Sequence, residues 1–202
     1  MKPKDKKNYL NRYNSMLSQF GYSPKSLGWS GGEEMQFLRF KILSEIGFET
    51  NDSVLDIGCG FADLYGYLQK RRLNCNYLGL EINDNLLEVA LKQYPSVQVK
   101  LKDILIEPVK KKYDWVVSSG IFNAKLESES NVNYITEMLG KMIAIANKGV
   151  AVDFLSSYVD YQGELSFHLD PGKAIEIAKS LTDKIIVRMD YLKFEYTIYM
   201  YV

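Results

Sequence analysis

An apolar run that ends in a glycine-rich turn constrains this chain more than any other feature of its sequence. The run and its turn read Val54-Leu55-Asp56-Ile57-Gly58-Cys59-Gly60. Continuous apolar residues before such a turn are typical of a buried parallel strand that leads into a helix. Gly58 and Gly60 allow a close approach of the backbone that side chains would block. We therefore expect a ligand at the carboxyl end of this strand.

An acidic residue follows the next predicted strand. Residues 76–80 form a second apolar run, and Glu81 comes twenty-one residues after Gly60. A carboxylate at this place can accept hydrogen bonds from both hydroxyl groups of a ribose. The turn and Glu81 together predict a nucleoside-binding site.

A dinucleotide site is one alternative for this pattern. It would need a third glycine near Asp63, where the chain has Phe61-Ala62, and its glycine turn usually begins the domain. Here fifty residues precede the turn region. The pattern therefore favours another nucleoside cofactor over a nicotinamide dinucleotide, although an oxidoreductase stays open as an alternative.

The remaining hydrophobic pattern alternates strands with helices. We expect strands over 53–57, 76–80, 97–101, 113–118, 149–155, 184–189 and 195–202, and helices over 6–20, 33–46, 61–71, 83–93, 132–146 and 171–180. This alternation predicts an α/β, Rossmann-like three-layer sandwich around a mostly parallel seven-stranded sheet. The link over 190–194 is too short for a parallel crossover, so the last strand should be antiparallel. Residues 1–50 are expected to form a helical extension or lid, and residues 51–202 the main domain.

Composition narrows the classes of partner. Lys and Arg total 25 and so do Asp and Glu, which argues against nucleic acid as the partner because phosphate binding usually needs a basic face. Two cysteines without metal-type spacing predict a reducing compartment and no metal site. The charged start of the chain and the lack of a long apolar run predict a cytoplasmic protein that does not enter a membrane. We expect a monomer or a homodimer.

Four motifs in this order resemble the class I S-adenosylmethionine-dependent methyltransferases. Besides the glycine turn, they are Tyr77-Leu78-Gly79-Leu80-Glu81-Ile82, Lys102-Asp103-Ile104 and the predicted strand Tyr113–Ser118 with Ser119-Gly120. The resemblance covers residues 50–202 and implies S-adenosylmethionine as cofactor and S-adenosylhomocysteine as product. The cofactor-binding residues that it implies are Asp56, Gly58, Cys59, Gly60, Glu81, Ile82, Asp103, Ile104, Ser119 and Gly120.

The flanking segments resemble a small bacterial subgroup of these enzymes. The similar segments are 23–29, 119–123 and 155–161. That subgroup carries a His-Asp-Phe sequence near the last hairpin, whereas this chain reads Tyr191-Leu192-Lys193-Phe194-Glu195. No role of that histidine can therefore be transferred to this chain.

Candidate residues for the acceptor lie in three predicted loops. Trp29 could cover the bound sulfonium with its aromatic face, or it could anchor the N-terminal helix. Asn123 could orient the acceptor, and His168, the only histidine, could act as a general base or be a surface residue. The residues expected to contact the substrate are Trp29, Phe122, Tyr158 and Tyr161.

The resemblance implies transfer of a methyl group to a small-molecule acceptor. The residues after 118 read Ser119-Gly120-Ile121-Phe122 and lack the Pro-Pro-Tyr of base-amine methyltransferases, which argues against methylation of nucleic-acid bases. We expect a hydroxyl or amine of a sugar or envelope-glycan precursor as the acceptor. The lack of a metal cluster argues against catechol-type chemistry. A cofactor-binding scaffold or partner subunit without turnover is the alternative.

Overall fold

The computed structural model describes residues 1–29 and 31–202, and Ser30 of the predicted loop lies outside them. Two helices and a short 3-10 helix come first: α1 (Pro3–Phe20), η1 (Pro24–Leu27) and α2 (Gly32–Ser44). The strands are β1 (Ser53–Ile57), β2 (Asn76–Glu81), β3 (Val99–Leu101), β4 (Tyr113–Ser118), β5 (Ala146–Leu155), β6 (Lys184–Arg188) and β7 (Glu195–Tyr201). The remaining helices are α3 (Asp63–Lys70), α4 (Asp84–Gln93), α5 (Asn131–Ala144) and α6 (Pro171–Leu181).

The strands form one seven-stranded sheet in the order β3-β2-β1-β4-β5-β7-β6. Strands β1 to β5 pair in parallel, whereas β7 runs antiparallel to both β5 and β6. The predicted mostly parallel sheet with a reversed last strand is therefore confirmed. The short link between β6 and β7 leaves no room for a crossover, so the chain must turn back.

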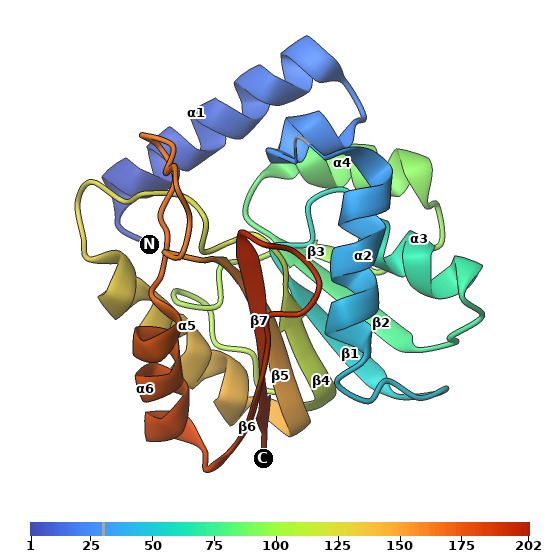
Figure 1. Cartoon of the computed structure of the whole chain (residues 1–202). Coiled ribbons are helices and arrows are strands. Elements are labelled where there is room, and N and C mark those ends of the chain that lie inside the picture. Colours follow the sequence, from blue (N-terminus) through green and yellow to red (C-terminus); the bar gives the residue numbers. More distant parts are fainter. Residues whose placement is uncertain (30) are drawn as a thin grey trace.

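Helices cover both faces of the sheet and complete the three layers (Figure 1). On one face α5 and α6 pack over an apolar cluster that includes Leu55, Val116 and Ile135. On the other face α2 and α3 enclose a second cluster around Leu43 and Val54. Because β1, β4 and β5 are covered on both sides, their residues read as continuous apolar runs.

The structure changes some predicted boundaries. The helix expected from residue 61 begins only at Asp63, because Ala62 has a positive φ of 59° and cannot be part of a right-handed helix. The helix expected to reach residue 146 ends at Ala144, and β5 already begins at Ala146. The predicted loop after residue 23 contains the 3-10 turn η1, whose first residue is Pro24.

Helix α1 lies across the end of the sheet at which the parallel strands finish (Figure 1). Its buried Asp5 accepts hydrogen bonds from the backbone amides of Glu127 and Ser128, at 2.9 and 3.1 Å. Near its other end, Asn14 Oδ1 accepts from the side-chain amides of Asn83 and Asn85, at 2.9 and 3.1 Å. These polar contacts fasten α1 over the edge where ligands of open α/β sheets bind.

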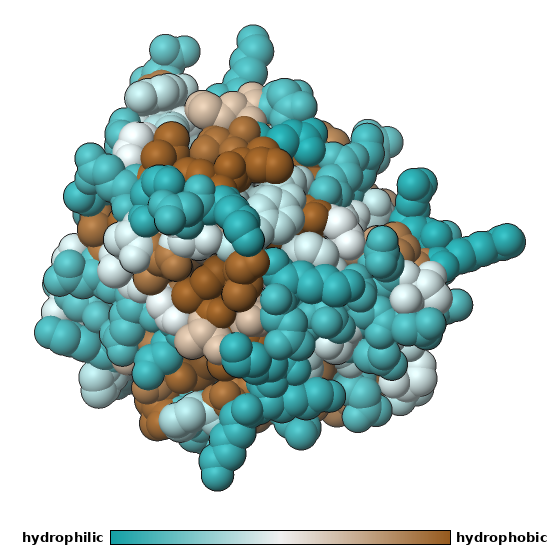
Figure 2. Space-filling view, turned by 90° about the horizontal axis from the view of Figure 1, so that it is seen from below, coloured by the Kyte–Doolittle hydropathy of each residue, from teal (hydrophilic) through white to brown (hydrophobic). Residues whose placement is uncertain are grey.

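The end of the molecule opposite α1 is mostly hydrophilic, with hydrophobic residues gathered in a central band (Figure 2). Within the described residues, no helix is long and apolar enough to cross a membrane.

Stacked aromatic rings offer a direct test of the packing between β5, β7 and α5. The ring of Phe154 is 2% exposed and lies 5.3 Å from that of Phe122 and 5.4 Å from that of Tyr196. Phe154→Ala should lower the free energy of unfolding by about 3–5 kcal/mol, because it leaves a cavity in the core. Urea denaturation measures the change. Tyr161→Ala, at a side chain that is 79% exposed, is the control and should change stability by less than about 0.5 kcal/mol.

Candidate active site

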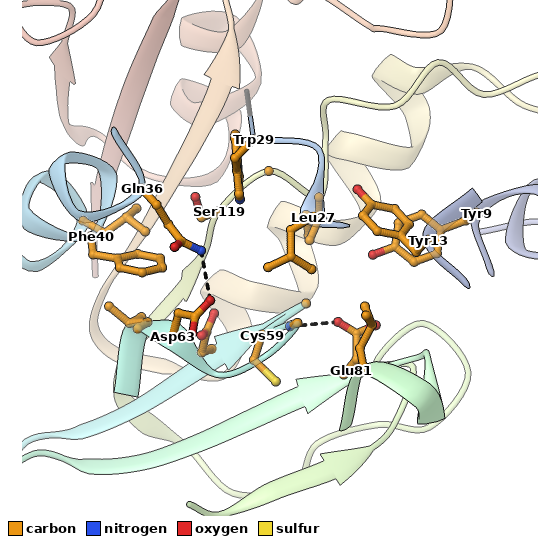
Figure 3. Close-up of a pocket in the computed structure, with 18 residues that line it drawn as sticks. Tyr9, Tyr13, Leu27, Trp29, Gln36, Phe40, Cys59, Asp63, Glu81 and Ser119 are labelled. Carbon is orange, nitrogen blue, oxygen red and sulfur yellow. Dashed lines mark hydrogen bonds between the residues drawn. The ribbon is translucent and has the colours of Figure 1, made fainter. Parts of the chain in front are cut away.

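An inner cavity of about 50 Å³ lies beneath α1 at the carboxyl ends of β1, β2 and β4. It brings together residues from the glycine turn, from α1 and α2, and from the segment after β4 (Figure 3). Its lining includes Tyr9, Tyr13, Trp29, Gln36, Asp56, Gly58, Cys59, Gly60, Asp63, Glu81, Ser119 and Gly120. The cavity therefore lies where the sequence predicts a nucleoside site.

The buried carboxylate of Glu81 lies in the wall of this cavity. It is 1% exposed and accepts hydrogen bonds from the backbone amides of Gly60 at 3.0 Å, Ile82 at 2.7 Å and Asn83 at 3.0 Å. Burial raises the pKa of Glu81, while the three amides oppose that rise because they favour the ionised form. The hydrogen bonds fix the carboxylate at the junction of the turn after β1 and the end of β2.

Asp56 lies in the wall of the same cavity, and a hydrogen bond holds its carboxyl group. The hydroxyl of Tyr77 donates to Asp56 Oδ2 at 2.7 Å, across the pairing of β1 with β2. Burial raises the pKa of Asp56 to about 7; the bond from Tyr77 opposes the rise, and the negative charges of Glu81 and Asp153 add to it. A cation placed in this cavity would favour the ionised form of Asp56.

Both glycines of the turn have backbone angles that suit glycine. Gly58 has a φ of +74°, and a Cβ there would lie 2.2 Å from Cγ2 of Ile121. Gly60 has a φ of +54°, and a Cβ would meet the side chain of Leu27 at 3.1 Å. The turn is therefore packed against the segment after β4 and against η1, and side chains at these positions would narrow the cavity.

A lateral cavity of about 40 Å³ continues along the ends of β2 and β3. Ile82, Asp103 and Ile104 line it, together with Tyr134 and Met138 of α5. Asp103 Oδ1 accepts from the amide of Leu105 at 3.1 Å, and its other oxygen lies 3.6 Å from the ammonium of Lys6 on α1. An apolar slot with a carboxylate at its edge suits a flat ring that carries an amino group.

All ten residues predicted to bind a cofactor line these two cavities. The inner cavity is lined by Asp56, Gly58, Cys59, Gly60, Ser119 and Gly120, and the lateral cavity by Ile82, Asp103 and Ile104. Glu81 lines both. Gly58 also reaches the lateral cavity. Tyr9 of α1 lines both cavities and lies above Glu81 in Figure 3.

An outer cavity of about 230 Å³ adjoins the inner one. Tyr13, Leu27, Trp29 and Gly120 line both cavities, so they form the boundary between them. The outer cavity also has in its wall Arg12, Arg39, Asn123, Leu155, Phe194 and Glu195. It is the larger space, and it opens beside the residues that follow β4.

Trp29 packs directly against the segment after β4. A Cβ on Gly120 would lie 2.6 Å from Cζ2 of Trp29, so only glycine allows this contact. The guanidinium carbon of Arg39 lies 4.2 Å from the centroid of the Trp29 ring. Both interpretations of Trp29, an aromatic cover and an anchor of the N-terminal helix, stay predictions.

A buried carboxylate accepts hydrogen bonds from the segment after β4. Asp153 on β5 is 2% exposed; it accepts from the hydroxyl of Ser119 and, at 2.7 Å, from the amide of Gly120. Burial raises the pKa of Asp153 to about 6, and the charge of Glu195 adds to this effect. The arrangement orients the Ser119 hydroxyl at the wall of the inner cavity.

The structure corrects one predicted substrate contact. Phe122 is 2% exposed and stacks with Phe154, so its side chain belongs to the apolar core below the site and not to a substrate pocket. The sequence pattern could not predict that Phe122 is part of the core, because an aromatic residue after a strand fits an apolar core and a substrate pocket equally well.

Three other predicted residues lie away from the cavities described above. Tyr158 and Tyr161 are 66% and 79% exposed in the loop after β5. Nδ1 of His168 lies 2.7 Å from the carbonyl oxygen of Ser156, and the ring does not line the inner, lateral or outer cavity. Asn123 does line the outer cavity, where its Oδ1 accepts from the amide of Leu155 at 3.3 Å.

Two buried polar pairs of the site were not predicted. Gln36 of α2 donates to Asp63 Oδ2 at 3.1 Å at the start of α3 (Figure 3). Arg39 forms a two-pronged ion pair with Glu195, with bonds of 2.7 and 2.5 Å. A polar residue at a helix position that faces the core was the available signal for Gln36 and Arg39. Glu195 is 156 residues from Arg39, so no local pattern could pair them.

The described residues contain no cluster of three or more histidine, cysteine, aspartate or glutamate side chains that could hold a metal ion.

Comparison with known proteins agrees with this fold. A family model described as a methyltransferase domain matches residues 54–142. The chain is 26% identical to "Putative methyltransferase Rv1506c" of Mycobacterium tuberculosis over 152 residues, which cover 72% of this chain and 90% of that protein. It is 28% identical to "Putative methyltransferase 235L" of Invertebrate iridescent virus 6 over 112 residues, 55% of this chain and only 42% of the viral protein.

Among solved structures, the fold is similar to that of magnesium protoporphyrin IX methyltransferase from Synechocystis with bound S-adenosylhomocysteine. The TM-score is 0.70 at 12% identity, over 98% of this chain and 99% of that one. The family model covers less than half of the chain, and the identities to the relatives are low, so these comparisons show what the chain is similar to: a methyltransferase domain over residues 54–142 and a fold shared with S-adenosylmethionine-dependent methyltransferases.

The raised pKa of Asp56 leads to a prediction about stability and pH. The folded state holds a proton on Asp56 up to a pH of about 7, whereas the unfolded chain releases it near 4. This group therefore lowers stability progressively as pH rises from about 4 to about 7. Asp56→Asn should show a smaller loss of melting temperature between pH 5 and pH 7.5 than the wild type.

Thermal unfolding followed by circular dichroism measures this difference. Tyr77→Phe removes a bond that favours the ionised carboxylate, so it should steepen the pH dependence. Identical slopes for the wild type and Asp56→Asn would show that Asp56 does not titrate in this range.

Proposed function

We propose that this chain binds S-adenosylmethionine in the inner and lateral cavities and transfers its methyl group to a small-molecule acceptor. The observation that carries the proposal is the fixed carboxylate of Glu81 between the glycine turn and the apolar slot beside Asp103. A structure with a similar fold holds S-adenosylhomocysteine, which supports the choice of cofactor.

The residues present fit such a cofactor from end to end. The Glu81 carboxylate would accept from the ribose hydroxyls, and Asp103 from the adenine amine, with Ile82 and Ile104 on the ring. Asp56 would contact the methionyl amine, near the backbone of Gly58 and Gly60. The cofactor supplies an activated methyl group with a good leaving group, so the protein mainly has to position the acceptor.

Charge in the inner cavity suits a cationic cofactor. Asp56 and Glu81 are buried there, and Asp153 lies directly behind its wall. Each carboxylate has a raised pKa because burial disfavours its charge, and a sulfonium or ammonium close by would reverse that penalty. Cofactor binding should therefore be accompanied by ionisation of the acid cluster.

The acceptor would enter through the outer cavity. That cavity shares Gly120 and Trp29 with the inner one, and Asn123 in its wall could orient the acceptor. A space of about 230 Å³ supports a small-molecule acceptor rather than a polymer. A sugar or envelope-glycan precursor remains our prediction for its class.

A change at Glu81 tests the cofactor proposal. Glu81→Gln should weaken the binding of S-adenosylhomocysteine by about 1–3 kcal/mol, because hydroxyl groups of the ribose lose a charged acceptor. Calorimetric titration measures the affinity, with NAD as the control ligand for the wild type. Glu176→Gln on the exposed face of α6 is the matched control and should bind like the wild type.

Equal affinity of Glu81→Gln and the wild type would remove Glu81 from the site, and binding of NAD alone would replace the proposal by an oxidoreductase. Binding of S-adenosylhomocysteine without turnover of any small acceptor would favour the cofactor-binding scaffold.

We further propose that α1 is a lid over the cofactor. The inner and lateral cavities have room for only a few water molecules, and Tyr9 stands between them. A nucleoside cofactor therefore requires α1, or at least Tyr9, to move before it can enter. The bonds of Asn14 to Asn83 and Asn85 would close the lid again over the bound cofactor.

Hydrogen exchange tests the lid. Saturating S-adenosylhomocysteine should slow amide exchange in residues 5–20 several-fold. Asn14→Ala should raise the dissociation rate of S-adenosylhomocysteine several-fold, because it removes the hydrogen bonds from Asn83 and Asn85. Asn11→Ala, exposed on the same helix, is the control. If exchange in α1 does not respond to the ligand, the helix is a fixed anchor and not a lid.

A further inference from the structure

We propose that the acceptor of this methyltransferase is an anion: a small molecule with an apolar body and a carboxylate or phosphate group, held by Arg39 and Arg12 in the outer cavity. This inference rests on the proposed function and names the substrate class for the same site. It follows from a buried hydrogen-bond donor without a partner, from the balance of charge in the cavity wall and from the nature of the other walls.

Arg39 carries the first observation. Its side chain is 4% exposed and lines the outer cavity, and its Nε and Nη2 donate to the two carboxylate oxygens of Glu195. Its Nη1 is buried without any hydrogen-bond partner among the described residues. A buried guanidinium nitrogen with no acceptor is costly, and such groups are rare outside functional sites.

The charge balance of the cavity points the same way. The ion pair with Glu195 neutralises Arg39, because both carboxylate oxygens are engaged. Arg12 of α1 also lines the cavity, and among the described residues it takes part in no ion pair within 4.0 Å. The cavity wall therefore has one excess positive charge and a vacant donor, the combination that recognises an anionic oxygen group.

The other walls define the rest of the molecule. Leu27, Trp29, Leu155 and Phe194 give the cavity apolar and aromatic sides. The Trp29 ring lies against the Arg39 guanidinium at 4.2 Å, so a shift of this ring would open the path to Nη1. An anion with a flat or branched apolar body would fill the 230 Å³ between these side chains.

The outer cavity adjoins the cavity in which we propose that the cofactor binds. Gly120 lines both the inner and the outer cavity, and the neighbouring Ser119, whose hydroxyl donates to Asp153, lines the inner one. An anionic group held by Arg39 and Arg12 would therefore fix the acceptor beside Gly120, at the boundary with the cavity that we propose for the cofactor. Arg39 and Arg12 would act as residues that position and select the acceptor.

Three aromatic probes of similar shape test the proposal. Benzoate, phenyl phosphate and the neutral benzamide are titrated by calorimetry into the full chain saturated with S-adenosylhomocysteine. We expect at least one anion to bind ten-fold or more tightly than benzamide, and the tighter anion identifies the group as carboxylate or phosphate. Equal binding of benzamide and both anions, or binding of none of them, would overturn the proposal.

Two variants locate the anion. Arg12→Gln should weaken the preferred anion ten-fold or more and leave S-adenosylhomocysteine affinity unchanged, whereas Lys4→Gln, exposed on the same helix, should change neither. Arg39→Lys keeps a charge opposite Glu195 but loses the planar fork, so it should weaken the anion without unfolding the protein. Circular dichroism checks the fold of each variant.

The outcomes separate this inference from the proposed function. If Arg39→Lys and Arg12→Gln weaken S-adenosylhomocysteine as much as the anion, the arginines hold the cofactor's own carboxylate and the inference fails. If the wild type does not bind S-adenosylhomocysteine, the proposed function fails instead. The anion titration without cofactor then still decides whether Arg12 and Arg39 form an anion site.

Discussion

The structure of the site depends on one carboxylate that three backbone amides hold in place. Glu81 joins the turn after β1, through Gly60, to the end of β2, through Ile82 and Asn83. A carboxyl group buried to this extent is tolerated because its oxygens are already hydrogen-bonded. The three amides thus fix the Glu81 carboxylate in a position where it could accept hydrogen bonds from ribose hydroxyls. They also hold it between the inner and lateral cavities, both of which it lines.

Positive groups from the N-terminal region complement this acidic centre. Lys6 approaches Asp103 from α1, and Arg39 of α2 reaches Glu195 at the start of β7. The segment before residue 50 therefore contributes directly to the candidate site, because its residues line the inner and lateral cavities and much of the wall of the outer one. Acidic groups line the inner cavity, and an excess of positive charge lies in the wall of the outer one.

The sequence predicted the sheet and the residues that line the inner and lateral cavities, because both depend on local signals. Apolar runs, the glycine turn and the acid that ends β2 are readable within a few residues, and their meeting at one edge follows from parallel strand order. The acceptor side could not be predicted in this way. Phe122 is part of the core, and the pairing of Arg39 with Glu195 joins elements at opposite ends of the chain, so only the packed structure reveals them.

The reversed direction of β7 has a consequence for how such a site can vary. Because β7 is antiparallel, its first residue Glu195 pairs with Leu155, the last residue of β5, at the edge where the cofactor strands finish. The hairpin that precedes it, including Phe194, therefore borders the outer cavity and lines neither the inner nor the lateral one. Insertions or substitutions in this one surface turn could reshape the outer cavity while the inner and lateral cavities stay as they are, which makes the hairpin a place where related chains can diverge in the ligand of the outer cavity.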